Sequence, residues 1–183
     1  RRAAIGRALK AAGGGIAVLP TAPEVPRNRD SDFPYRHDSY FYYLSGFAEP
    51  DSVLVLVAAL DARAARAILF CRAKDPDHEI WDGFRYGPDA ARTAFGFDEA
   101  YPVDELDHRM VGMLSNAPAL YYAPGHSAAL DAQIKAISEI EAERDDLLGL
   151  AEIAASEEDN ASGDEIYSML SALRGRAAGV SSR

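Results

Sequence analysis

The chain has 183 residues, a formal net charge of −10 and a single cysteine. Its length fits one domain that buries its own core, and one cysteine excludes an intramolecular disulfide. No apolar run reaches the roughly 20 residues that cross a bilayer, and no secretion signal is recognisable at the start. We therefore expect a soluble, cytoplasmic protein with no membrane partner.

The negative charge is concentrated in one segment. Residues 131–164 contain 11 acidic and 2 basic residues, which leaves the rest of the chain nearly neutral. A protein that binds nucleic acid carries a basic face, often with stacking aromatic side chains. The basic cluster at 27–36 is instead interleaved with Asp30 and Asp32. We therefore exclude a nucleic-acid partner.

The first elements in chain order are a short helix and a strand. Ile5 and Leu9 recur at helical spacing, and the three glycines at 13–15 end that helix. Residues 15–20, GIAVLP, form the kind of short apolar run that is typical of a strand buried on both faces. Ligand sites in open α/β sheets gather at strand ends, so the loop that follows is a candidate site.

That loop begins the stretch 22–50, APEVPRNRDSDFPYRHDSYFYYLSGFAEP. Pro23 and Pro26 fix two backbone φ angles and donate no hydrogen bonds, so residues 23–34 are predicted to be an ordered loop rather than sheet or helix. The aromatic run at 40–44 is rich in β-prone side chains and predicts a strand that anchors the charged loop. With the apolar runs SVLVLVA and AILFC, at 52–58 and 67–71, it would form a three-stranded meander.

The second half alternates helices with strands. Residues 72–87, RAKDPDHEIWDGFRYG, are polar and irregular and form a second candidate site loop. Helices are predicted at 88–95 and 104–114, a strand at 119–122, and a long helix from 127 to about 156. That long helix continues into a turn and a second amphipathic helix, so the carboxy-terminal region predicts an acidic helical hairpin. The whole pattern predicts an α/β fold with a mixed β-sheet flanked by helices.

No catalytic or metal site is recognisable by motif. None of the four histidines has HExxH or HxH spacing with a partner. The cluster Asp75, Asp77, His78 and Glu79 lacks the EF-hand pattern, and a solvated turn is the better interpretation. Cys71 ends an apolar run and is predicted to be a buried core thiol. A nucleophile elbow and a phosphate loop are also missing.

Three motifs in series carry a family resemblance. They are A-P-E-V-x-R at 22–27, D-S-x-F-P-Y-R at 30–36 and F-x-Y-L-x-G-F-x-E-P-x-x-V-L-V-L at 41–56. This series resembles the amino-terminal domain of Xaa-Pro aminopeptidases (aminopeptidase P), which is similar to the amino-terminal domains of creatinase and prolidase. The resemblance continues through E-I-W at 79–81 and Gly83, and more weakly to about residue 137. It implies a ribonuclease H-like α/β sandwich over residues 1–183. Residues 138–172 depart from the family pattern, and we interpret them as an inserted helical hairpin.

The resemblance also implies a function without catalysis. In the family, a carboxy-terminal pita-bread domain holds two divalent ions, typically manganese, on two Asp, one His and two Glu. Those ions activate the water that releases the first residue of a peptide with proline in second position. That domain is absent from this chain, so no cofactor is expected here. The implied partners are the chain's own catalytic domain, further copies in a homo-oligomer, and the peptide substrate.

The resemblance places two residues at a rim over a neighbouring subunit's active site, Asp30 of the R-x-x-D-S motif and Trp81 of E-I-W. An aspartate among arginines stays ionised and can receive a peptide's ammonium terminus, and an indole face suits a proline ring. The alternatives are an ion pair of Asp30 with Arg27 or Arg36, and core packing of Trp81. Arg27, Tyr35 and Arg36 are expected to brace the loop.

A second function belongs to a different class. The charge concentrated in the hairpin at 138–173 is also compatible with a stand-alone protein-interaction module that recruits partners through this acidic surface. Deletion of the hairpin separates the two hypotheses, because only the interaction module loses a partner.

Overall fold

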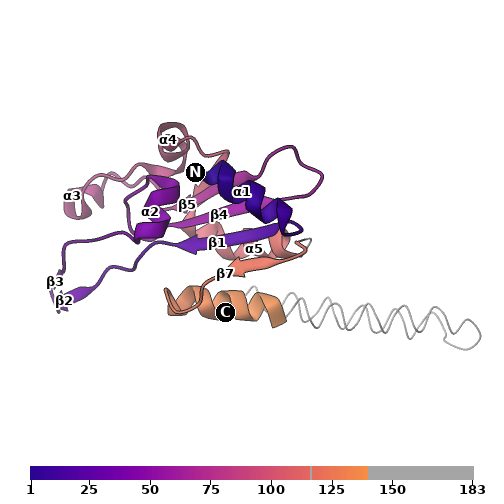
Figure 1. Ribbon diagram of the computed structural model, residues 1–183. Helices are drawn as coiled ribbons and strands as arrows, with labels where there is room; N and C mark the ends of the chain where they lie inside the picture. Colours follow the sequence, from indigo (N-terminus) through magenta and orange to yellow (C-terminus); the bar gives the residue numbers. More distant parts are fainter. Residues whose placement is uncertain (116, 140–183) are drawn as a thin grey trace, which may run out of the picture. The chain divides into compact units, whose positions relative to one another are not determined.

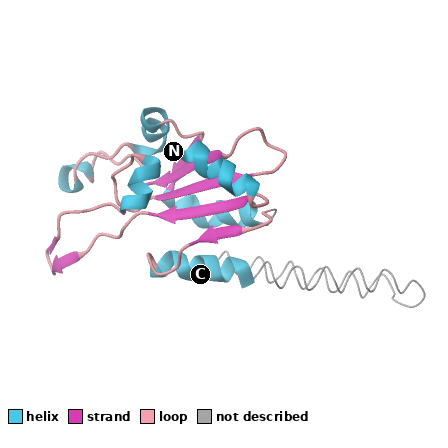
Figure 2. Ribbon diagram, in the orientation of Figure 1, coloured by secondary structure: helices cyan, strands magenta, loops and turns pink. Residues whose placement is uncertain are grey.

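A five-stranded mixed sheet organises the computed structural model, which describes residues 1–115 and 117–139 (Figures 1 and 2). Residues 1–137 form one compact unit. The strand order is β6-β5-β4-β1-β7. The strands are β1 (Gly15–Pro20), β4 (Val53–Ala58), β5 (Arg66–Cys71), β6 (Glu99–Pro102) and β7 (Leu120–Tyr122). Strand β4 is antiparallel to β1 and β5, whereas β7 and β6 pair in parallel with β1 and β5.

Helices cover both faces of this sheet. Helices α1 (Arg2–Ala11), α2 (Ser39–Ser45) and α4 (Gly87–Phe95) contribute to one buried cluster. On the other face lie α5 (Leu106–Leu114), which follows the 3-10 turn η1 (Val103–Glu105), and a helical stretch that begins at residue 128. The three layers confirm the predicted α/β fold with helices on both sides of a mixed sheet.

The central strands are apolar on both sides because each side meets a helical layer. In β4, Leu54 and Leu56 join the cluster that contains Phe41 of α2. The alternate residues Val53 and Val55 join the cluster on the opposite face. A continuous apolar run therefore reports a strand sandwiched between helices, as residues 15–20 and 52–58 predicted.

Most predicted elements are confirmed to within a few residues. The helix near the start, the strands at 15–20, 52–58 and 67–71, the helices at 88–95 and 104–114, and the strand at 119–122 are all present. Strand β6 was not predicted, since its sequence EAYP is short and half-buried at a sheet edge. Cys71 is fully buried as predicted, and burial raises the pKa of its thiol to about 12.

The aromatic run at 40–44 is a helix, so the predicted strand was wrong. Asp38 caps α2, because its Oδ1 accepts a hydrogen bond from the Phe41 N–H at 2.8 Å. Gly46 ends the helix with a φ of 71° and donates to the Tyr42 carbonyl at 2.8 Å. These two caps outweigh the β propensity of the aromatics. The three-stranded meander is wrong for the same reason, and the second neighbour of β4 is β1.

The first charged loop is more regular than predicted. Residues 23–34 were expected to avoid sheet, yet Pro26–Asn28 (β2) and Ser31–Asp32 (β3) form a short antiparallel pair. Pro26 is compatible with this two-stranded pair because, among the described residues, β2 has no second neighbouring strand that would need a hydrogen bond from its backbone nitrogen. The loop therefore projects as a small hairpin.

The carboxy-terminal expectations lie largely outside the described residues. The helix predicted from residue 127 is described over 128–139. The expected acidic hairpin at 138–172 falls on the remainder, from residue 140 onwards. Within 1–115 and 117–139, no helix combines the length and apolarity of a membrane span.

Candidate functional site

The two loops singled out by the sequence leave the sheet at the same end. Pro20, the last residue of β1, pairs with Val53, and Val53 pairs with Phe70 near the end of β5. The segment 21–52 runs from the end of β1 to the start of β4, and the segment 72–86 starts at the end of β5. These three strand termini lie side by side, so both segments join the sheet at the same end. Figure 1 shows β2, β3, α2 and α3 (Glu79–Asp82) beyond the same end of the strands. We call the two segments the rim loops.

Asp30 lies at the tip of the β2–β3 hairpin. Its backbone N–H donates to Asn28 Oδ1 at 2.9 Å, and Ser31 Oγ donates to the same oxygen at 3.1 Å. At the base of the hairpin, the Phe33 N–H donates to the Val25 carbonyl at 2.9 Å. Asn28 therefore shapes the turn, while the Asp30 side chain faces solvent.

The alternative of an ion pair between Asp30 and a neighbouring arginine is not what the structure shows. Among the ion pairs of the described residues, none includes Asp30, Arg27 or Arg36. Arg27 lies 6.0 Å from the centre of the Phe33 ring, and Arg36 Nη2 donates to Ser39 Oγ at 3.4 Å. The carboxylate at the tip is therefore available to a cationic group.

Tyr35, which follows the β2–β3 hairpin, bonds back to the start of the first rim loop. Its hydroxyl donates to the Ala22 carbonyl at 3.0 Å and lies 2.7 Å from Thr21 Oγ1. Burial raises the pKa of the Tyr35 phenol, so it remains a donor throughout the neutral range. This is the geometry that a bracing residue needs, and its contribution to the loop stays a prediction.

Trp81 projects from the second rim loop. Its side chain is 85% exposed, and that of the adjacent Ile80 is 78% exposed. Core packing, the alternative considered for Trp81, therefore does not hold. Phe84 in the same loop is also exposed. An exposed indole with exposed apolar neighbours is uncommon on a surface that only meets water.

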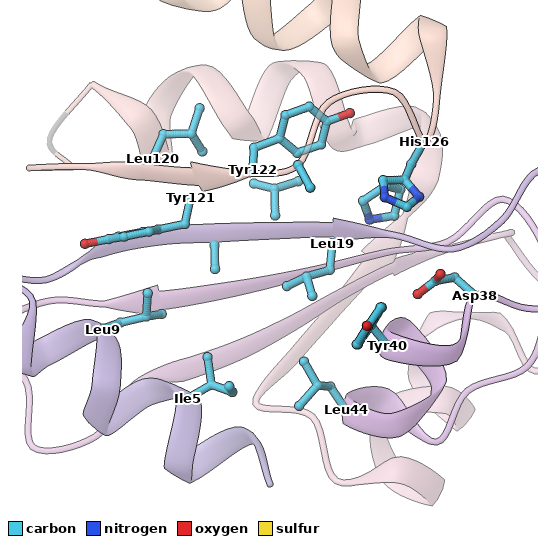
Figure 3. A pocket seen from close by; sticks show the side chains of 14 residues that line it. Ile5, Leu9, Leu19, Asp38, Tyr40, Leu44, Leu120, Tyr121, Tyr122 and His126 are labelled. Atoms are coloured by element: carbon cyan, nitrogen blue, oxygen red, sulfur yellow. The ribbon is translucent and has the colours of Figure 1, made fainter.

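Asp30 and Trp81 lie outside the apolar hollow formed by the described residues. The hollow shown in Figure 3, of about 600 Å³, lies between α1, α2, β1 and β7 and is mostly apolar. Leu9, Leu19 and Leu44 line it, with Asp38 and His126 at one end (Figure 3). Neither rim residue lines this hollow. Asp30 and Trp81 thus form two separate exposed points at one end of the domain.

Glu49 joins the rim loops and was missed by the sequence analysis. Its Oε1 accepts a hydrogen bond from the Tyr86 N–H at 2.7 Å, which ties the segment after α2 to the end of the second loop. Its Oε2 is buried without a hydrogen bond, and burial raises the pKa of the carboxyl. The available signal was an acidic residue placed between the buried Phe47 and Pro50.

We expect Glu49→Gln to stabilise the protein modestly at pH 7, by less than about 1 kcal/mol, because part of the charge is screened by solvent. The raised pKa means that the folded state penalises the ionised carboxyl. Wild-type stability therefore falls as pH rises from the ordinary glutamate pKa towards the raised value, and stays lower above it. Glutamine keeps an acceptor for Tyr86 without the charge.

Urea unfolding at pH 7 and at pH 4 measures this difference. The advantage of the Glu49→Gln variant should shrink at the lower pH, where both states of the wild type become protonated. A variant that is less stable than the wild type at pH 7 would show that the charge of Glu49 stabilises the fold.

The described residues offer no set of metal ligands. No three His, Cys, Asp or Glu side chains among them gather closely enough to hold an ion. Asp75 Oδ1 instead accepts from the backbone N–H groups of Asp77 and His78, each at 3.1 Å, and Oδ2 pairs with His78 Nδ1 at 2.7 Å. The hydrogen bond from His78 lowers the pKa of Asp75. The cluster is therefore a turn in which the Asp75 carboxylate is bonded by its own neighbours.

The comparisons with known proteins agree with one another. The family model "Aminopeptidase P, N-terminal domain" matches residues 1–121. The Xaa-Pro aminopeptidase of Escherichia coli K12 is 40% identical over 118 residues, which are 64% of this chain and 26% of that protein. Human Xaa-Pro aminopeptidase 3 is 36% identical over 115 residues, covering 60% of this chain and 23% of that protein.

Solved structures give the same result. A variant of E. coli aminopeptidase P in complex with substrate superposes with a TM-score of 0.68 at 35% identity, covering 75% of this chain and 32% of that chain. Proline aminopeptidase P II from Yersinia pestis gives 0.67 at 35% identity, with the same coverage. The chain spans about a quarter to a third of the length of these relatives. From its sequence motifs, its sheet and these matches, the chain belongs to the family of aminopeptidase P amino-terminal domains.

Proposed function

We propose that this chain is the non-catalytic amino-terminal domain of a metal-dependent Xaa-Pro aminopeptidase, with the rim loops bordering the route by which peptides reach the reaction centre. Its relatives from E. coli and human are Xaa-Pro aminopeptidase and Xaa-Pro aminopeptidase 3. The observation that carries the proposal is that both motif-bearing loops leave one end of the sheet with Asp30 and Trp81 exposed. Neither exposed side chain contributes to the core, so contact with a partner explains their positions better than a role in folding.

Each rim residue has a distinct task in this proposal. An ionised carboxylate without an ion pair can receive the ammonium terminus of a peptide. An exposed indole offers a flat apolar face to the proline ring in second position. The two side chains would therefore select a free amino terminus followed by proline, while the bond is broken by groups outside this chain.

The catalytic chemistry belongs to another domain. We propose that two divalent ions, manganese by the resemblance, are held by that domain, as the resemblance to aminopeptidase P implies. This chain would then bind that domain and, through it, peptides with proline in second position. Its cytoplasmic location is part of the same proposal.

We propose that the rim loops also contribute to a homo-oligomer. Of the large apolar side chains that are exposed in the described part of the chain, most lie on these two loops, and such a concentration marks an interaction surface. They are Val25, Phe33, Tyr40, Tyr42, Tyr43, Ile80, Trp81 and Phe84. Light scattering of the protein that joins this chain to its catalytic domain should give more than the mass of one protomer. If light scattering gives the mass of one protomer, the rim loops cannot contribute to the active site of a neighbouring subunit.

Steady-state kinetics on that two-domain protein tests the role of the rim. Asp30→Asn and Trp81→Ala should each lower kcat/KM for Xaa-Pro peptides about tenfold or more, which is the effect of losing roughly 1.4 kcal/mol of transition-state binding. For Trp81→Ala the loss should be larger for peptides with proline in second position than for any slow substrate without it, whereas for Asp30→Asn it should be similar for both.

Leu60→Ala is the matched control. Leu60 is an exposed apolar side chain that follows β4, at the end of the sheet away from the rim loops. Its substitution should leave kcat/KM unchanged. Unchanged kinetics in both rim variants, with folded protein and the same oligomeric state, would contradict a rim role for Asp30 and Trp81.

A further inference from the structure

The turn that carries Trp81 has almost no apolar anchor. Helix α3 is only four residues long, and Ile80 and Trp81 both point away from the core. An isolated single turn of helix is unstable in water, so other contacts must hold it. Several of those contacts come from one side chain, that of Lys74.

Lys74 contacts the loop on both sides of Trp81. Its Nζ lies 2.5 Å from Glu79 Oε1, at the start of α3, and donates to the Arg85 carbonyl at 2.8 Å. The same nitrogen lies 4.2 Å from the centre of the Phe84 ring. A lysine ammonium has three N–H donors, and here one carboxylate oxygen, one backbone carbonyl oxygen and one aromatic face surround it. One ammonium group thus contacts both ends of the segment 79–85.

A second set of contacts completes this closure. Glu79 Oε1 also accepts a hydrogen bond from the Arg85 N–H at 3.1 Å, so the two ends of the turn are joined directly. The pKa of Glu79 is lowered, first by its hydrogen bond with Lys74. The carboxylate therefore keeps its charge at neutral pH and Lys74 keeps its partner.

The stem of Lys74 is also held in place. Gly87 has a φ of 70°, and a Cβ at that position would lie 2.9 Å from Lys74 Cβ and 3.1 Å from its backbone nitrogen. Glycine at 87 lets the chain return directly against Lys74. Gly87 thus packs against the backbone of Lys74, while Glu79 and Arg85 bind its ammonium group.

We propose that Lys74 is a positioning residue, whose ammonium group holds the Trp81 turn in the conformation that meets the peptide. This inference rests on the proposed function of Trp81. An exposed ion pair contributes little to the free energy of unfolding. Lys74 therefore keeps one turn ordered and does not stabilise the fold as a whole. A preordered indole binds without the entropy cost of ordering the loop.

Backbone ¹⁵N relaxation on the full 183-residue chain tests this inference. In the wild type, the amide of Trp81 should have an order parameter in the rigid range, about 0.85. Lys74→Met keeps the apolar stem and removes the ammonium group. In this variant the order parameter should fall below about 0.6 at Trp81 and Gly83, while the strands of the sheet stay rigid.

The matched control is Lys10→Met. Lys10 also donates to a backbone carbonyl, that of Ala62, but it lies on α1. This change should leave the amide of Trp81 unaffected. A Trp81 turn that is already mobile in the wild type, or one that stays rigid in Lys74→Met, would overturn the inference.

Kinetics in the two-domain protein separates this inference from the proposed function. Lys74→Met should lower kcat/KM in the wild-type background and add no further loss in Trp81→Ala, because it acts through the indole. If relaxation changes as expected but neither substitution alters kcat/KM, the positioning role stands and the substrate role of Trp81 fails. If Trp81→Ala is slow while Lys74→Met leaves both relaxation and kinetics unchanged, the positioning role fails alone.

Discussion

Replacing Phe41 with alanine is expected to lower the free energy of unfolding by about 3 to 5 kcal/mol, the usual cost of emptying a buried phenylalanine site. Phe41 is fully buried and belongs to the cluster between the sheet and the helices α1, α2 and α4. Its loss leaves a cavity against Leu54 and Leu56 of β4. Urea or thermal unfolding of the whole chain measures the change.

Tyr43→Ala distinguishes the observed helix from a strand at this position. In a strand, residues 41 and 43 would share one face, and both substitutions would be costly. In α2, Phe41 is buried whereas Tyr43 is 55% exposed and lies 4.1 Å from the Arg1 guanidinium. We therefore expect Tyr43→Ala to cost about 1 kcal/mol or less, since its cation–π contact is at the surface. Equal, large losses at both positions would contradict the helix.

The second large effect is expected for Gly15→Ala, at about 2 to 5 kcal/mol, the sum of backbone strain and overpacking. Gly15 has a φ of 127°, and an added Cβ would lie 2.4 Å from the carbonyl oxygen of Ala119. That carbonyl accepts the hydrogen bond of the Ile16 N–H at 2.8 Å, at the start of the β1–β7 pairing. The methyl group would push the short edge strand β7 away from β1.

Gly13→Ala is the control for backbone strain alone. Gly13 has a similar φ of 101°, but nothing lies within 4 Å of an added Cβ. Its substitution should cost about 1 to 2 kcal/mol. Unfolding by urea gives both values. If Gly15→Ala and Gly13→Ala lowered the free energy of unfolding equally, the close approach to the Ala119 carbonyl would not contribute to the cost.

The sequence predicted the centre of the sheet because that signal is local. Strands β1, β4 and β5 are apolar runs of strand length, and each is bounded by glycine, proline or polar residues. Helix α2 was harder, since its aromatic composition favours a strand while its flanking Asp38 and Gly46 favour a helix. The caps decided the outcome, because they satisfy backbone groups that a seven-residue helix leaves open.

The site was predicted in part. The two charged loops at 23–34 and 72–87 were predicted from proline, charge and polarity in the chain itself, whereas the exposed aromatic side chains of α2 were not. The contact of Lys74 with Arg85 was not predicted, because it depends on how the second loop folds back on itself. The contact of Glu49 with Tyr86 was not predicted either, because it depends on which strand ends meet across the sheet. A single sequence contains no sign of that pairing between residues far apart in the chain.

The central claim is that the rim loops border a reaction centre housed in another domain. A structure of the assembled two-domain protein with an Xaa-Pro peptide bound tests it most directly. We expect the indole of Trp81 to lie within about 4 Å of the peptide and the carboxylate of Asp30 within hydrogen-bond distance of the peptide's amino terminus. The peptide can be bound in the same protomer or in a neighbouring one. A peptide bound at the metal centre with both side chains facing open solvent would contradict the account.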